Sequence, residues 1–111
     1  MADVFTAAAA LGQLATEGHD FAEFFRAPSG SLSLTIARWP AGSIDDQAPH
    51  TEDEVYYFIN GTAMLDVGGE AAVVGPGSIA FVAAGVEHRF RDIVEDIEVL
   101  VFWSPARQTN R

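Results

Sequence analysis

The chain contains no cysteine among its 111 residues. Without cysteine, neither a disulfide framework nor a thiolate metal site can form, and two common ways of stabilising or equipping a small protein are excluded. Lysine is absent as well. Sixteen acidic residues against six arginines give a formal net charge of −10. A surface this acidic repels phosphate backbones and anionic lipid headgroups. We therefore expect neither a nucleic acid nor a membrane surface among the partners.

Long hydrophobic runs are also missing. No stretch approaches the roughly 20 apolar residues that cross a bilayer. The N-terminus, M-A-D-V-F-T-A-A-A-A-L-G-Q-L, has Asp3 where a secretion signal has basic residues, and its apolar part is mostly alanine. This pattern is typical of a short helix rather than a signal. The expected localisation is cytoplasmic.

The residues that are present predict one folded domain. Nearly half of them are hydrophobic (49%), and a chain of this length is about one domain. From Phe5 to about Thr16 the sequence is rich in alanine, with Leu11 and Leu14 spaced for one helical face and Gly18 as the stop. No helical period follows this segment.

The rest of the chain has the pattern of short strands. From residue 31, S-L-S-L-T-I-A-R-W alternates between apolar and small polar residues, which predicts a half-buried strand. Asn60-Gly61 and Gly68-Gly69 are hairpin signals because both pairs tolerate positive φ. Evenly spaced strands of this kind predict a sandwich or a small barrel. The further strands are expected at 55–59, 62–67, 71–74, 78–82, 87–91 and 97–102.

The chain has three histidines. His19 lies in E-G-H-D-F just after the helix, without a partner at a useful spacing, and we interpret it as a surface residue. His88 lies in A-G-V-E-H-R-F-R, where strand alternation places it with Phe90 on the face opposite the charged residues. His88 therefore points inward. It is either a buried neutral imidazole satisfied by a backbone carbonyl or a metal ligand.

The stretch H-T-E-D-E, residues 50–54, is the second candidate. His50, Glu52 and Glu54 share one parity, which continues into Tyr56 and Phe58 and so into the interior. A buried carboxylate needs a proton, an arginine or a metal. A divalent cation shared by His50, Glu54 and His88 meets that need and leaves coordination positions open. Glu52 and its neighbour Asp53, taken alone, are typical of a solvated hairpin tip.

These residues resemble the first motif of the cupin superfamily, G(X)5HXH(X)3,4E(X)6G. Glu54 is followed by six residues and Gly61, and His50 precedes Glu54 by three intervening residues. Ala48 stands where the family has its first histidine, so the usual set of three histidines and one glutamate is reduced to two histidines and Glu54. Glu52 could replace the missing ligand, or His50 and Glu52 could take the first and second places.

The second cupin motif, G(X)5PXG(X)2H(X)3N, fits in spacing from Gly77 through Gly85 and His88. Ala83 replaces its proline and Asp92 its asparagine. Fifteen residues separate the two motifs, as in compact members. The chain is thus similar to a small single-domain cupin, and the resemblance implies an all-β, jelly-roll barrel over about 31–103, preceded by a helix and strand extension over 1–30.

By this resemblance, His50, Glu54, His88 and Glu52 are candidate ligands of a divalent transition metal (Fe, Mn, Ni or Zn) in the barrel mouth. Two functions follow as expectations. One is a metal-dependent enzyme, dioxygenase- or isomerase-like, acting on a small molecule. The other is a non-catalytic protein that binds or senses a small metabolite, with or without a structural metal. The candidate substrate-binding residues are Tyr56, Phe58 and Phe90, and further candidates for the pocket wall are Trp39, Phe81 and Trp103.

Two remaining features carry weaker expectations. Arg38 lies on an otherwise apolar parity and is a candidate to pair with a buried acid or an anionic substrate. The N-terminal helix and residues 21–25 (F-A-E-F-F) form an apolar patch that is large for a small monomer to expose. Since barrels of this family dimerise, we expect a homodimer.

Overall fold

The computed structural model describes residues 3–18 and 20–108. Helix α1 (Ala7–Glu17) lies close to its predicted bounds, and it ends at Gly18 as predicted. Thr6 is the N-cap, and its hydroxyl accepts a hydrogen bond from the backbone N–H of Ala9. Gly18 closes the C-terminus in a left-handed conformation (φ 69°) and donates its N–H to the carbonyl of Leu14. These caps satisfy backbone groups that a short helix leaves unpaired. No helix in the described part of the chain is long and apolar enough to cross a membrane.

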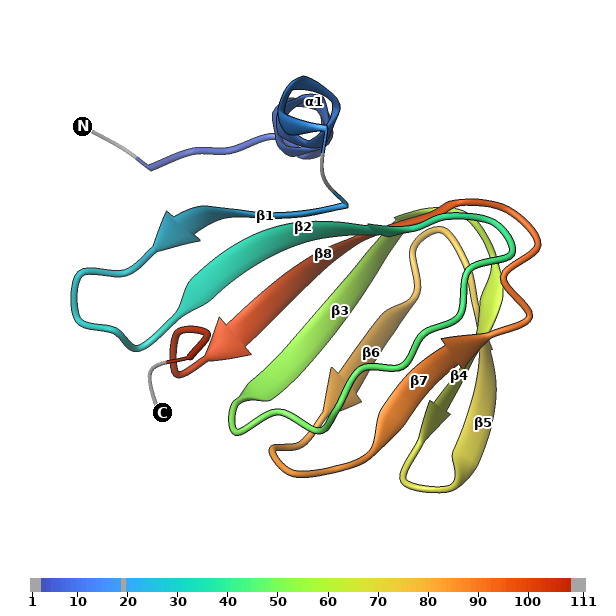
Figure 1. Cartoon of the computed structure of the whole chain (residues 1–111). Helices are drawn as coiled ribbons and strands as arrows, with labels where there is room; N and C mark the ends of the chain where they lie inside the picture. Colours follow the sequence, from blue (N-terminus) through green and yellow to red (C-terminus); the bar gives the residue numbers. More distant parts are fainter. Residues whose placement is uncertain (1–2, 19, 109–111) are drawn as a thin grey trace.

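The remaining elements are strands in two antiparallel sheets (Figure 1). The five-stranded sheet has the order β1-β2-β8-β3-β6, and the three-stranded sheet has the order β5-β4-β7. This is the predicted all-β architecture of two sheets with one short helix. The strands are β1 (Phe21–Arg26), β2 (Ser33–Trp39), β3 (Asp53–Asn60), β4 (Ala63–Val67), β5 (Glu70–Val74), β6 (Ile79–Val82), β7 (His88–Arg91) and β8 (Ile97–Ser104).

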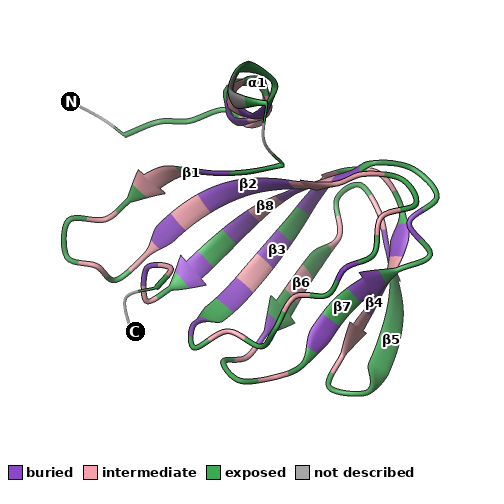
Figure 2. Cartoon of the chain, in the orientation of Figure 1, coloured by how far each residue is buried: buried purple, intermediate pink, exposed green. Residues whose placement is uncertain are grey.

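The main core lies between the two sheets. Figure 2 shows buried and less buried positions alternating along β3 and β8, as expected of strands with one face in a core. Tyr56 and Phe58 of β3 pack against Phe90 of β7, with ring centroids 5.6 and 5.7 Å from that of Phe90. These aromatic side chains thus pack the two sheets together inside the barrel, further along β3 than its first residues.

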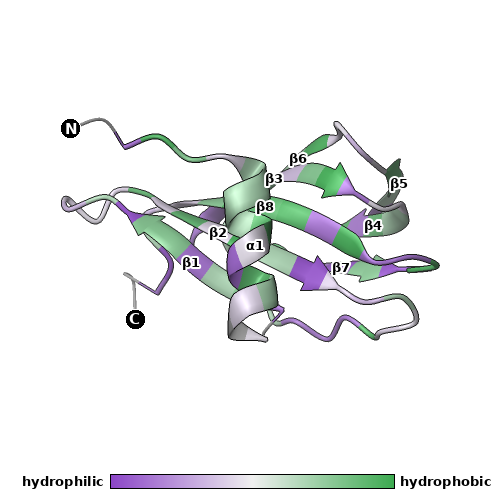
Figure 3. Cartoon of the chain, turned by 90° about the horizontal axis from the view of Figure 1, so that it is seen from above, coloured by the Kyte–Doolittle hydropathy of each residue, from purple (hydrophilic) through white to green (hydrophobic). Residues whose placement is uncertain are grey.

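β2 differs from its prediction, because it is buried on both faces. Ser33 and Thr35 point into the barrel, where their hydroxyls are satisfied: the indole N–H of Trp103 donates to Thr35 Oγ1 at 3.0 Å, and the backbone N–H of Arg107 donates to Ser33 Oγ at 2.8 Å. Ile36 faces outward, yet it is fully buried, because Leu14 of α1 packs there. Figure 3 shows the helix lying across the outer face of this sheet. The predicted alternation of β2 is therefore confirmed, whereas the prediction that one of its faces is exposed is wrong.

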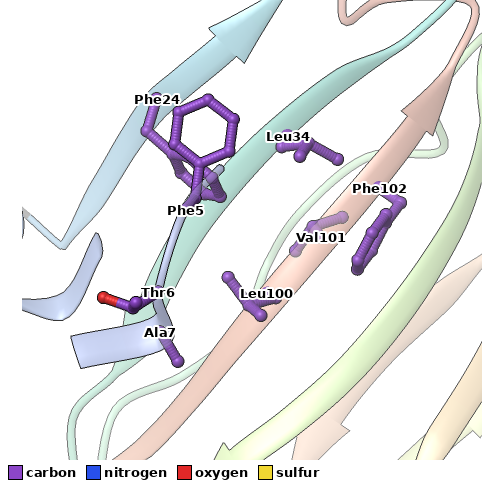
Figure 4. A pocket seen from close by; sticks show the side chains of 8 residues that line it. All are labelled: Phe5, Thr6, Ala7, Phe24, Leu34, Leu100, Val101 and Phe102. Atoms are coloured by element: carbon purple, nitrogen blue, oxygen red, sulfur yellow. The ribbon is translucent and has the colours of Figure 1, made fainter. Parts of the chain in front are cut away.

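The predicted apolar patch at residues 21–25 is strand β1 at the edge of the large sheet. The segment before α1 covers part of it, since the Phe5 ring lies 5.4 Å from the rings of both Phe24 and Phe25. A cavity of about 190 Å³ remains beside this contact, without any titratable group in its wall (Figure 4). The homodimer stays a prediction.

Gly61 illustrates how the glycine of the first motif serves the fold. It follows β3 with φ 86°, a conformation that side chains other than glycine rarely adopt. A Cβ at this position would lie 2.8 Å from the Cα of Ile97 and would also collide with the backbone oxygen of Asp96. Only glycine allows the turn after β3 to press against the start of β8.

Candidate metal centre

Three of the four predicted ligands come together at the end of the barrel where β3 begins. Glu54 lies in the second position of β3, between Trp103 of β8 and Val82 of β6, and points inward. His88 begins β7 in the opposite sheet, and His50 lies in the loop before β3. One donor atom from each residue lies within 4.8 Å of the others. Residues 38 positions apart in the chain thus meet at one point.

The individual distances have the scale of a shared coordination sphere. Glu54 Oε1 lies 3.5 Å from His50 Nε2 and 3.7 Å from His88 Nε2. Nitrogen and oxygen ligands that share a first-row ion, with bonds of about 2.0–2.2 Å, lie about 3.0–3.6 Å apart. The two distances from Glu54 lie close to this range, and no pair of the three donors is more than 4.8 Å apart, so the side chains would close on one another to bind one ion.

A backbone carbonyl determines which nitrogen of the His88 ring faces the cluster. Its Nδ1 lies 2.9 Å from the carbonyl oxygen of Val86. Because a carbonyl only accepts, Nδ1 carries the hydrogen, and the neutral ring then has its lone pair on Nε2. That lone pair faces Glu54. Both readings of His88 from the sequence, a histidine satisfied by a carbonyl and a metal ligand, are thus compatible, since a carbonyl commonly orients a ligating imidazole in this way.

Glu54 is a buried carboxyl group, and one of its oxygens has no hydrogen-bond partner among the described residues. Its side chain is 1% exposed, and the oxygen in question is Oε1. Burial raises the pKa of Glu54 to about 7; the hydroxyl of Tyr56 beside it opposes this rise, and the charge of Glu52 adds to it. The Tyr56 hydroxyl is close enough to influence Glu54, but neither it nor Oε1 makes a hydrogen bond of good geometry with a described residue. Burial also raises the pKa of Tyr56 well above 10, so the phenol stays neutral.

A divalent cation fits these residues. The cation would be the missing partner of Glu54 Oε1 and would also bind the lone pair of His88 Nε2. Its ligands would be two neutral imidazoles and one carboxylate. Such a donor set suits Zn, Fe, Mn or Ni, and the chain offers no thiolate to select a softer ion. The burial that penalises the free carboxylate thus favours a bound ion.

Glu52 is the predicted ligand that the structure does not bring to this group. Its Oε2 accepts hydrogen bonds from the backbone N–H of Gln108 at 2.7 Å and from Thr51 Oγ1 at 3.1 Å. The alternative of a solvated hairpin tip is wrong for Glu52, which is 1% exposed. β3 begins only at Asp53, so the extended parity assumed for residues 50–54 does not hold ahead of it. Glu52 instead fastens the C-terminal segment to the barrel.

Gln47 is the residue that sequence reasoning missed. Its Oε1 lies 3.2 Å from His50 Nε2 and 3.1 Å from His88 Nε2. Its amide nitrogen donates to Asp45 Oδ2 at 2.7 Å. Gln47 belongs to the polar loop between β2 and β3, where no strand or helix period predicts the direction of a side chain. Its spacing of three residues from His50 is the one local signal that could have drawn attention to it.

A cavity of about 190 Å³ adjoins the cluster. Its wall brings together aromatic rings, the candidate donors and one guanidinium. The ring centroids of Phe21 and Trp103 lie 4.6 and 5.6 Å from the Arg107 Cζ atom. The lining residues are Phe21, Ala37, Trp39, Gln47, His50, Glu54, Tyr56, Val101, Trp103 and Arg107.

The other predicted residues are distributed between the cavity, the core and the surface. Tyr56 lines the cavity, whereas Phe58 and Phe90 are buried in the main core. Phe81 is 59% exposed on the outside of the barrel, so the prediction that it forms the pocket wall is wrong. Arg38 lies near two acids, 3.6 Å from Asp20 and 3.5 Å from Glu98, rather than in the cavity. His19 lies outside the described residues.

Comparisons with known proteins agree with this architecture. The family model of the cupin domain matches residues 35–104. The uncharacterized protein SCO3923 of Streptomyces coelicolor is 44% identical over 75 residues, which are 68% of this chain and 71% of that protein. The family match runs from β2 through β8 and so includes all three donors.

Two solved structures are similar as well. KdgF from Halomonas sp. has a TM-score of 0.70 at 18% identity, with 82% of each chain covered. The DMSP lyase DddQ from Ruegeria pomeroyi DSS-3 has a TM-score of 0.67 at 26% identity. That likeness covers 81% of this chain and 49% of DddQ, so the chain spans about half the length of that enzyme.

Proposed function

Because the chain belongs to the cupin family, we propose that it binds a divalent transition metal and presents that ion to a small organic acid in the adjoining cavity. His50, Glu54 and His88 would hold the ion. The observation that carries the proposal is the buried Glu54 Oε1, which has no hydrogen-bond partner among the described residues and faces two imidazole nitrogens at 3.5 and 3.7 Å. Three protein donors leave positions open for a ligand, as in catalytic rather than structural sites.

The bound ion would act as a Lewis acid on an oxygen atom of the small molecule. Tyr56 lines the cavity beside Glu54, and burial keeps its phenol protonated. It is thus a hydrogen-bond donor available to a bound oxygen, or a positioning group for Glu54. Trp103 packs edge-on against the His50 ring at 4.9 Å, and both side chains line the cavity.

Arg107 supports an organic acid as the ligand class. Its guanidinium lies against two aromatic rings at the cavity and makes no ion pair within residues 3–18 and 20–108. Arg26, Arg38 and Arg91, in contrast, all lie beside acidic side chains. In a chain with a net charge of −10, a cavity-wall arginine without an ion pair among the described residues, whose charge reaches Glu54 across the same cavity, favours an anionic ligand.

Catalysis is the favoured form of this function. DddQ, 26% identical to this chain, is a lyase, which supports an enzyme on this fold over a passive carrier. A binding or sensing protein is the second candidate. The two differ in outcome: an enzyme consumes organic acids of the fitting size in a metal-dependent manner, whereas a sensor only binds them.

Metal binding is the first experiment. The protein is stripped with a chelator and titrated calorimetrically with Zn²⁺, Mn²⁺, Ni²⁺ and, without oxygen, Fe²⁺. The proposal expects one ion per chain in the wild type and its loss in His88→Ala. Glu87→Gln is the matched control, since Glu87 precedes His88 but faces solvent. A wild type that binds every ion no more tightly than His88→Ala does would overturn the proposal.

A further inference from the structure

We propose that Gln47 is a fourth protein ligand of this ion, through its side-chain Oε1, and that Asp45 is the residue that positions it. The inference rests on the proposed function, because it adds a ligand to the same metal centre. It also explains how the site compensates for Ala48, which stands where the first histidine of the motif belongs.

The position of Gln47 Oε1 is that of a ligand. It is 3.1 Å from His88 Nε2 and 3.2 Å from His50 Nε2, which are separations expected of donors sharing one ion at bonds of about 2.1 Å. Since the carbonyl of Val86 holds the hydrogen of His88 on Nδ1, the neutral ring offers a lone pair toward Gln47. Two acceptors that face each other at 3.1 Å repel unless a proton or a metal ion lies between them, and a metal ion would serve both imidazoles and Glu54 at once.

Asp45 determines which end of the Gln47 amide faces the imidazoles. A carboxylate only accepts hydrogen bonds, so the amide NH₂ has to point to Asp45 Oδ2, 2.7 Å away. The amide oxygen is thereby directed to the two histidines. Asp45 also accepts from the backbone N–H of Gln47 at 3.2 Å, which fixes the start of the side chain.

Asp45 is itself anchored to the strand that carries His88. Its Oδ2 accepts the backbone N–H of Phe90 at 2.8 Å, and Asp45 is 5% exposed. A buried carboxylate with three such bonds is a rigid support. The loop between β2 and β3 is thus tied to β7, so that Gln47 and His88 keep their relative positions before any ion arrives.

The nature of the ligand has a consequence for the ion. An amide oxygen is neutral, so Glu54 remains the one charged protein ligand and the bound ion keeps a formal net charge of +1. An amide is also a weaker donor than an imidazole or a carboxylate. We therefore expect Gln47 to yield its position to an incoming anionic oxygen more readily than His50, His88 or Glu54 would.

The test measures metal affinity and ligand geometry in Gln47→Ala, Gln47→Glu and Asp45→Asn. Zn²⁺ affinity is determined by competition with a chromophoric chelator, and the visible absorption of the Co²⁺ form reports on the ligand set. Gln13→Ala, on the helix outside the barrel, is the control. Apo-protein circular dichroism confirms that each variant is folded.

We expect Gln47→Ala and Asp45→Asn to lower Zn²⁺ affinity by about 10- to 100-fold, the range found when ligands lose their support. Both should change the Co²⁺ spectrum, and Gln13→Ala should do neither. Gln47→Glu keeps an oxygen donor and adds a charge at the ion, but it also sets a second carboxylate against Asp45 Oδ2. Its Zn²⁺ affinity should therefore differ from that of the wild type by more than twofold, and it carries the test if Gln47→Ala does not fold. Affinity within twofold of the wild type in both Gln47 variants would overturn this inference and leave the three-ligand site intact. A wild type that binds no ion would overturn both.

Discussion

Replacing Glu54 by glutamine should remove a large pH dependence from the stability of the metal-free protein. Burial holds the pKa of Glu54 at about 7 in the folded state, against 4.5 for the free side chain. Between these values the folded protein binds more protons than the unfolded chain does. The free energy of unfolding therefore falls as pH rises. The contribution of Glu54 is fully present below pH 4.5 and is lost as pH rises through 7.

The size of the effect follows from the shift of the pKa. At about 1.4 kcal/mol per pKa unit, a rise from 4.5 to about 7 corresponds to about 3 kcal/mol of lost stability. Glutamine has the shape of the protonated acid and cannot ionise, so the variant avoids this penalty at every pH. At pH 8 the metal-free variant should be more stable than the metal-free wild type by up to about 3 kcal/mol.

Urea unfolding from pH 5 to 8 measures this difference. Both proteins are stripped of metal and kept in chelator, and unfolding is followed by tryptophan fluorescence. Other acids and the growing net charge affect both proteins equally, so the difference between the two curves isolates Glu54. The curves should converge near pH 5 and separate by pH 8, with the variant above the wild type. Parallel curves would refute the reasoning, because they would mean that Glu54 ionises as easily in the folded protein as in the unfolded chain.

Three further predictions follow from the same structure. The metal affinity of the wild type should rise between pH 6 and pH 8, since the ion must displace the proton that burial holds on Glu54. Calorimetry in two buffers of different ionisation enthalpy should detect the released proton, and a pH-independent affinity would argue against Glu54 as a ligand. Gly61→Ala should lower the free energy of unfolding by about 3 kcal/mol or more, because the added Cβ collides with the backbone at Ile97. Gly12→Ala, in the open helix, should raise it by about 0.5–1 kcal/mol, and equal urea midpoints for the two variants would contradict this. Arg107→Gln should weaken binding of small organic acids at least tenfold while leaving Zn²⁺ affinity within twofold, and a parallel loss of both would show that Arg107 supports the fold rather than the ligand.

Much of the fold could be predicted because its signals are local. Alternation and glycine turns placed every strand from β2 to β8 within about two residues of the predicted bounds. The exposure of β2 could not be predicted in this way. Ile36 is buried by α1 on the outer face, and Thr35 is buried by its bond to Trp103 on the inner face. Both contacts depend on how distant elements pack.

In the candidate site, too, residues on strands could be predicted better than residues in loops. Glu54 and His88 lie on strands, where parity predicts the direction of a side chain. Glu52 lies one residue before β3 begins, where parity no longer applies, and its carboxylate bonds to Gln108 instead. Gln47 and Asp45 lie in a loop whose path is set by the contact of Asp45 with β7, so apart from the spacing of Gln47 from His50 no local pattern indicates them.

Anomalous diffraction from crystals grown with Zn²⁺ would show whether one ion binds between His50, Glu54 and His88. We expect one strong peak at the zinc edge, with His50 Nε2, His88 Nε2 and Glu54 Oε1 each within about 2.3 Å. Crystals grown in excess Zn²⁺ that show no peak among these three side chains, with His50 and His88 holding separate hydrogen-bonded positions, would contradict it.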